Sequence, residues 1–492
     1  MQLCRLPFFS DPDSSPFSQS AFIAIIQLDS IELRGQDCGD YKPLATYNSR
    51  GDKEVVDSVR RRMRLSPPRG EDDLSTWFLY SLNKKRIQAV ERMFEQNKIV
   101  KDPEIEGYVN KVMGRINQGI IENPRVFILN SPYVNAKNFG DGILVVTTGL
   151  LARCYNEDQL AFVLAHEIAH DKLKHVNDRM RRIAELKKEK RNKQQIILIL
   201  TDEKLLKDIQ EQKRLYYQLA NNSREQEGEA DSLGFLLLSN AGYSPHEAIT
   251  MLDILEKSDS MKYDIGIDLF MPLHSRDYPF QDKWLNPRLS VYRGEIANDE
   301  MAMYDSARSH PAIHERKEFL RHMPSFPAIG TFPSTVLPQL NKVAFEIVET
   351  AIKDRMYDRA LFHALQLLHR HPCNSFLVTR ISGILLKLSA LEDKMAINIY
   401  VPRYTFGYSN DLRFINNMLH NMSQNEMSEV AYYMLKNKAY FNQDNRNHYY
   451  LMERICNLTY REEEASQMRK LYKAKFNEPI SAGNPEHQLI LD

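Results

Sequence analysis

The residue types and spacing at positions 166–170 could build a metal-dependent hydrolytic site. His166 and His170 are four residues apart, so on a helix their imidazole rings share one face and can hold one metal ion. Glu167 lies beside them, where its carboxylate can reach a water molecule on that metal. The H-E-x-x-H pattern therefore indicates two zinc ligands and a catalytic base. For the pattern alone, the alternative is two polar-face histidines beside a paired carboxylate.

A third ligand is predicted in the acidic segment that follows downstream. A catalytic zinc needs three protein ligands and one open position. Glu227 and Asp231 are four residues apart and share a helix face. Glu227 can complete a His/His/Glu site, while Asp231 can accept the second N–H of a ligand histidine. Taken alone, the cluster would instead be typical of a solvated helix N-terminus, but the upstream histidines favour the metal site.

Both segments carry the signals of a helix start. Asn156 with Gln159, and Ser223 with Gln226, each predict a capping box ahead of an apolar run. The apolar segment 143–148 is expected to form a strand just before the first of these helices. Its edge could hold an extended substrate by β-augmentation. The expected fold class is α+β and mostly helical, with a small sheet.

At these motifs the chain resembles the HtpX-like, CAAX-prenyl-endopeptidase-like and Oma-type zinc metalloproteases, which are gluzincins. The resemblance covers roughly residues 77–322. The matching segments are 135–136, 140–149, 156–175, 227–231 and 309–311, with Arg316 soon after the last. It implies one zinc ion per chain and a metalloendopeptidase activity. It also implies that the E-x-x-x-D glutamate, here Glu227, is the third zinc ligand.

The resemblance suggests roles for two further residues. Asn135 matches the family's Asn-Ala segment and could donate a hydrogen bond to substrate backbone. His310 stands before a proline, as in the family's His-Pro element. We expect His310 within reach of the zinc, on a loop that must move for substrate entry. It could hold the enzyme off or steady the oxyanion, and we favour the inhibitory role. His274 is expected to be a surface residue.

The length of 492 residues predicts two folded domains. Residues 1–38 are expected to be a leader or a poorly ordered segment. A zinc metalloprotease domain is predicted over residues 39–335, with a helical insertion at 177–222. An all-α, tetratricopeptide-like helical-repeat domain is predicted over residues 336–492.

The helical-repeat prediction depends on one segment above all. Residues 341–372 have the length and layout of one tetratricopeptide unit, with Ala360 at the small packing position. The longest apolar candidates, residues 22–28 and 196–200, are far too short for a transmembrane helix. A zinc protease without such helices and with a repeat tail resembles the BepA (YfgC) branch of periplasmic quality-control proteases.

This resemblance implies a function, partners and a location. The expected protein cleaves unfolded or misassembled proteins in the periplasm or another extracytoplasmic compartment, and its repeat domain presents substrate or contacts envelope assembly machinery. The N-terminus would then hold an atypical or misannotated leader, because its apolar stretch is short and only Arg5 precedes it as a basic residue. The 65 basic and 65 acidic residues balance, which argues against nucleic acid as the main partner.

Two alternatives stay open from the sequence. The repeat tail could make this chain chiefly a chaperone or adaptor with a latent, histidine-gated protease domain, although every expected catalytic residue is present. A peptidase restricted to small peptides would share the zinc motif but should lack a presenting domain. The basic stretch 179–195 fits a solvated helix pair, a peripheral contact with anionic lipid headgroups, or a lid over the cleft.

Overall fold

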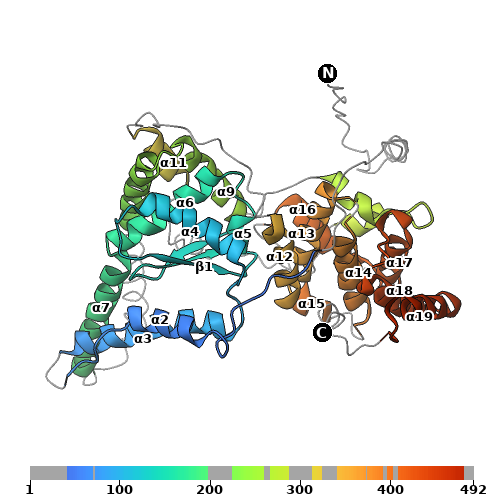
Figure 1. Ribbon diagram of the computed structural model, residues 1–492, viewed down its shortest axis with the longest axis horizontal. Helices are drawn as coiled ribbons and strands as arrows, with labels where there is room; N and C mark the ends of the chain where they lie inside the picture. The colour runs from blue at the N-terminus through green and yellow to red at the C-terminus, as the bar shows by residue number, and fades with distance from the viewer. Residues whose placement is uncertain are drawn as a thin grey trace. The chain divides into compact units, whose positions relative to one another are not determined.

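The computed structural model in Figure 1 contains two compact units that interleave along the chain. The first unit takes in Pro43–Ser260 and Val291–Thr350, and the second Met261–Ser290 and Ala351–Asp492, together with Met1–Lys42. The structure describes residues 41–69, 73–197, 224–259, 266–286, 313–323, 341–372, 374–391, 396–402 and 408–480. The predicted leader at 1–38 lies outside these residues.

A three-stranded sheet forms the centre of the first unit. Its strands are β1 (Arg125–Leu129), β2 (Ala136–Asn138) and β3 (Ile143–Thr147), in the order β1-β3-β2. β1 pairs with β3 in parallel, and β2 pairs with β3 antiparallel. The prediction that the β3 segment offers a free edge is therefore wrong. Every residue of β3 is buried, as is typical of a central strand covered on both faces, and β1 and β2 are the two edge strands.

Helices cover both faces of this sheet, as Figure 1 shows. Alternate residues of β1 and β3 point to opposite faces, so each strand contributes to two cores. On one face lie α4 (Pro103–Asn117) and α6 (Glu157–Lys172), packed on Val126, Ile128, Leu144 and Val146. On the other lie α2 (Lys53–Arg62) and α3 (Leu74–Glu95), packed on Phe127, Ile143 and Val145.

The turn between β2 and β3 is tied to two helices. Gly140, Asp141 and Gly142 all have positive φ, at 83°, 55° and 71°, a conformation that glycine adopts without steric cost. Arg86 of α3 donates to the Asp141 carboxylate at 2.5 Å. The Gly142 N–H donates to the Asp171 carboxylate of α6 at 2.9 Å. The edge of the sheet is thereby fixed against α6.

The remaining helices of the first unit come after the sheet in the sequence. The described residues of the predicted insertion, 177–197, form most of α7 (His175–Ile197), which packs along α3. In α12, Glu346 is fully buried and accepts hydrogen bonds from Asn130 Nδ2 at 2.5 Å and from the Leu44 N–H at 2.9 Å. The helices are α5 (Thr148–Leu151), α7 (His175–Ile197), residues 224–240, α9 (His246–Asp259), α11 (Ile313–Arg321) and the larger part of α12 (Asn341–Lys353).

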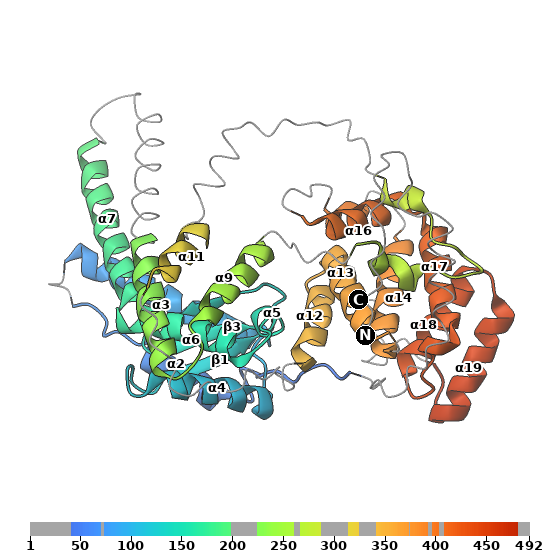
Figure 2. The same ribbon diagram turned by 90° about the horizontal axis from the view of Figure 1, so that it is seen from above.

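All the regular elements that the structure describes in the second unit are helices. In it α14 packs against α17, and α18 against α19 (Figure 2). Its elements are η1 (Ile267–Leu273), η2 (Asp282–Leu285), α13 (Tyr357–Arg370), α14 (Ser375–Ser389), α15 (Ile397–Tyr400), α16 (Asn410–Asn421), α17 (Gln424–Lys436), η5 (Lys438–Tyr440), α18 (Arg446–Leu458) and α19 (Glu462–Phe476).

The segment 266–286, which we expected within the protease domain, packs in this second unit. The Trp284 indole donates to Glu426 of α17 at 3.2 Å, and the Gly266 N–H donates to Asp411 of α16. His274 was expected to be a surface residue and not a ligand. It is half-buried, and its Nδ1 accepts a hydrogen bond from the backbone of this same segment.

The helices expected for a tetratricopeptide-like unit form as α12 and α13, and Ala360 is fully buried. However, most of α12 belongs to the first unit and α13 to the second. The repeat assignment and the boundary at residue 336 stay predictions. Among the helices that the structure describes, none combines the length and the apolar character that a membrane span requires.

Candidate metal centre

α6 carries two of the predicted ligands on adjacent turns. The helix begins after Asn156, whose side chain accepts a hydrogen bond from the Gln159 N–H at 2.9 Å, so the predicted cap is confirmed. Gln159 Oε1 accepts a hydrogen bond from the Tyr155 N–H instead of from the Asn156 N–H, so the second bond of the predicted capping box is not formed. One helical turn apart on this buried helix, His166 and His170 place their Nε2 atoms 3.0 Å from each other.

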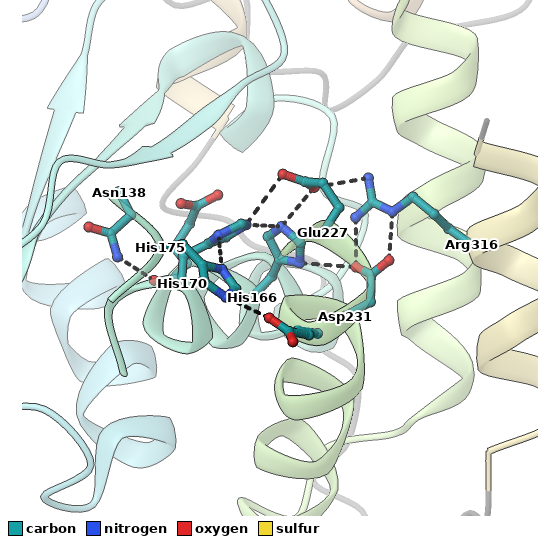
Figure 3. A network of polar contacts seen from close by, with 9 residues as sticks. Asn138, His166, His170, His175, Glu227, Asp231 and Arg316 are labelled. Atoms are coloured by element: carbon teal, nitrogen blue, oxygen red, sulfur yellow. Dashed lines mark hydrogen bonds and ion pairs between the residues drawn. The ribbon is translucent and has the colours of Figure 1, made fainter. Parts of the chain in front are cut away.

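The helix at residues 224–240 brings Glu227 to these two histidines. The Glu227 carboxylate oxygens lie 3.5 Å from His166 Nε2 and 3.5 Å from His170 Nε2. One ligand atom from each of the three residues lies within 4.8 Å of the others. Figure 3 shows the three side chains converging from two helices. The structure thus brings together the three residues that the sequence predicted as metal ligands. The capping residue predicted for this helix, Ser223, lies outside the described residues.

The separations fit a tetrahedral metal ion. With zinc–nitrogen bonds of about 2.0–2.1 Å, tetrahedral geometry holds two ligand nitrogens about 3.3 Å apart. The observed separations of 3.0 and 3.5 Å lie on either side of this value. Two imidazoles with one carboxylate are also a donor set found in catalytic zinc sites, where the fourth position stays open. The residues therefore fit a zinc ion.

Gly234 allows the two helices to pack this closely. A Cβ atom at Gly234 would lie 3.0 Å from both the Cα and the backbone nitrogen of His166. These are backbone atoms inside α6, so they cannot move aside as a flexible side chain would. The close approach sets Glu227, two turns before Gly234, over the histidines of α6. The sequence analysis missed this residue.

A buried ion pair supports the first histidine. Asp231 Oδ1 lies 3.0 Å from His166 Nδ1, and both Asp231 oxygens accept hydrogen bonds from Arg316 of α11 at 2.6 Å. Burial by itself raises the pKa of Asp231, but the hydrogen bonds from Arg316 and His166 outweigh burial and hold the pKa below its usual value. Asp231 is therefore an anion that can accept a proton of the His166 ring.

The same carboxylates act on His166 when no metal is present. Burial lowers the pKa of His166, yet the hydrogen bonds and negative charges of Asp231 and Glu227 outweigh burial and raise it to about 10. A metal ion must then displace a proton from this ring, because only a neutral imidazole can coordinate. The carboxylates thus favour a positive charge at this position, whether it is the proton on His166 or a bound metal ion.

Glu167 lies on the same turn as His166 and is buried. Its backbone carbonyl accepts a hydrogen bond at 2.7 Å from Asn138 Nδ2, at the end of β2 (Figure 3). Asn138 is itself buried, so this bond fixes the edge strand beside the predicted catalytic base. The sequence analysis did not single out Asn138.

The other predicted residues have different outcomes. The backbone of Asn135 pairs with Thr147 at the end of β3: its N–H donates to Thr147 Oγ1 at 3.0 Å, and its carbonyl accepts from the Thr147 N–H. A role for its side chain in substrate binding stays a prediction. His310 lies outside the described residues, so its predicted position near the metal is untested.

His175 was also missed as part of the site. It is buried, with Nδ1 2.9 Å from His170 Nδ1 and Nε2 3.0 Å from Glu229. Burial is the largest cause that lowers its pKa. Its place five residues after His170 was the one available signal, and that spacing does not share a helix face with the ligands.

A comparison with known protein families gives this geometry its context. Residues 100–324 match the family model of peptidase family M48. This segment, a little under half of the chain, is therefore similar to M48 peptidases. It contains all three candidate ligands, Glu167 and the Asp231–Arg316 pair.

A curated relative agrees with the family match. The mitochondrial metalloendopeptidase OMA1 of Arabidopsis thaliana is 31% identical to this chain over 132 residues. The alignment spans 27% of this chain and 26% of the relative, so the shared part is about a quarter of each protein. Both matches relate the chain to peptidases, and the relative is by its name a metalloendopeptidase.

Proposed function

We propose that this protein is a zinc-dependent endopeptidase that cleaves unfolded or misassembled proteins in extracytoplasmic quality control, with its helical second unit presenting substrate or a partner. The observation that carries the proposal is the convergence of His166, His170 and Glu227 inside the segment similar to M48 peptidases. The expected location and the role of the second unit are supported by the family resemblance of the sequence.

The chemistry follows from the positions of the residues. A zinc ion in this donor set would lower the pKa of its bound water and polarise a peptide carbonyl. Glu167 would take a proton from the attacking water and return it to the leaving amine nitrogen. Arg316 and Asp231 hold the ring of His166 in one orientation while this proton moves.

An extended substrate is expected to lie along β2. Among the described strands, β2 pairs only with β3, so a substrate strand could pair along its other edge. Asn138 ties β2 to the turn of α6 that carries Glu167, so a chain paired with β2 would run past the base. Extended pairing of this kind needs an unfolded stretch of substrate, which supports misfolded proteins as the substrate class.

The test is the substitution Glu167→Gln. We expect this variant to bind one zinc ion per chain as the parent does, and to lose about 100- to 10,000-fold in the rate of cleavage, because the proton acceptor is gone. Glu225→Gln, an exposed position on the neighbouring helix, is the matched control and should cleave like the parent.

The substrate pair is a reduced, carboxymethylated protein and the same protein in its native fold, assayed by gel electrophoresis and mass spectrometry. Cleavage should be confined to the unfolded form and should stop with a zinc chelator. Undiminished proteolysis by Glu167→Gln would exclude the mechanism. Equal cleavage of both forms would exclude quality control as the function.

A further inference from the structure

His170 has a hydrogen-bond chain of its own, separate from the Asp231–Arg316 pair that supports His166. His175 begins α7, directly after Lys174, whose φ of 59° turns the chain back toward α6. His175 Nδ1 lies 2.9 Å from His170 Nδ1, and its Nε2 lies 3.0 Å from Glu229 Oε2. Figure 3 shows His175 beside His170.

Metal binding at His170 Nε2 would fix which nitrogen of each ring carries a proton. His170 Nε2 faces His166 and Glu227, so Nε2 is the atom available to a metal and Nδ1 carries the proton. That N–H can donate only to an unprotonated Nδ1 of His175. His175 then carries its own proton on Nε2 and donates it to the Glu229 carboxylate. This arrangement would hold each ring in one tautomer and one orientation.

We propose that His175 is a positioning residue: with Glu229 it fixes the tautomer and orientation of His170 for metal binding. The proposal rests on the metal site proposed above. Glu229 lies two residues after Glu227 on the same helix, so one helix supplies both a ligand and the anchor of another ligand. The hydrogen-bond chain from His170 through His175 to Glu229 therefore links α6, α7 and the helix at 224–240 beside the candidate metal site.

The two supports differ in their exposure. Asp231 and Arg316 are both buried, whereas the Glu229 side chain is 64% exposed. Exposed hydrogen bonds compete with water, so the link from His175 to Glu229 should contribute less than the link from His170 to His175. We therefore expect a substitution of Glu229 to weaken zinc binding less than a substitution of His175.

The direct test is zinc affinity in the full chain, measured by competition with a chromogenic chelator. His175→Phe keeps the ring volume but removes the acceptor, and we expect about 10- to 100-fold weaker zinc binding. His175→Asn places an amide oxygen near the position of Nδ1 and should recover most of the affinity. Replacement of zinc by Co²⁺ adds a spectroscopic measurement, because a shifted ligand-field band in His175→Phe would report a reoriented His170.

Glu229→Leu covers the case in which His175→Phe does not fold, since position 229 is exposed. This variant should bind zinc more weakly than the parent but more tightly than His175→Phe, and Glu225→Leu, an exposed control on the same helix, should bind as the parent does. Unchanged zinc affinity in a folded His175→Phe, or in Glu229→Leu when His175→Phe is unfolded, would overturn the proposal. A parent chain that binds zinc but cleaves nothing would remove the proposed function and leave this inference intact.

Discussion

Asp231 and Arg316 illustrate how single residues set the charge of the site. Each is buried, and each satisfies the other through two hydrogen bonds of 2.6 Å. The pair supports His166, but a substitution of either partner should destabilise the fold, because it leaves an uncompensated charge inside the protein.

The first prediction concerns Arg316→Met. Loss of the guanidinium leaves Asp231 buried near Glu227, so we expect the free energy of unfolding of the first unit to fall by about 3–5 kcal/mol. The measurement is urea denaturation of the metal-free protein. The double variant Asp231→Asn with Arg316→Met should regain part of that loss, since no unpaired charge remains. Additive effects of the two substitutions would contradict the assignment of a coupled pair.

A second prediction concerns Gly234→Ala. The added methyl group would meet the backbone of His166 at 3.0 Å, so the helix at 224–240 must shift away from α6. We expect a loss of about 1–3 kcal/mol in stability, and weaker zinc binding because Glu227 moves with the helix. Thermal unfolding and chelator competition measure the two effects.

Gly228→Ala is the matched control for this substitution. Gly228 lies in the same helix, and a Cβ atom there meets nothing within 4 Å. Alanine should stabilise the helix at this position by up to about 1 kcal/mol through its higher helix propensity. Equal effects at positions 228 and 234 would show that close packing against His166 does not matter.

At the scale of elements, local patterns in the sequence predicted α6 well and its surroundings poorly. The cap at Asn156 and the spacing of His166 and His170 were readable because each depends on residues within one or two helical turns. The edge strand was misassigned, since a run of apolar residues reports burial but not which strand lies beside it. Arg316 and Asp231 are 85 residues apart, and no local pattern records such a pairing.

A third prediction concerns α18 in the second unit and its response to acid. His448 is 2% exposed, and burial lowers its pKa from 6.5 to about 4. The folded state therefore binds this proton less readily than the unfolded state, and stability is complete above pH 6.5 and falls as the pH drops toward 4. The full shift corresponds to about 3 kcal/mol.

The measurement is the urea stability of the second unit between pH 7 and pH 4, monitored by hydrogen exchange in α14 and α17. These two helices pack against α18 and against each other. His448→Phe cannot be protonated, so most of this pH dependence should disappear in that variant. A parent and variant with the same acid profile would rule out His448 as its source.

At the scale of the whole molecule, the candidate metal ligands all belong to the first unit. A ligand that binds only the folded state stabilises the part of the protein that forms its site. Zinc should therefore act on one unit of this chain, whereas protonation of His448 acts on the other.

The last prediction follows from this division. With free zinc at about 100 times its Kd, the first unit should gain about 2.7 kcal/mol of stability, and a chelator should remove that gain. Hydrogen exchange should then accelerate in α6 and in the helix at 224–240, while α14 and α17 keep their protection. Glu227→Gln, which loses the carboxylate ligand, should respond much less to the chelator. A uniform loss of protection across both units would contradict this prediction. It would mean that the two units unfold cooperatively, because zinc binding would then also stabilise helices that contribute no ligand.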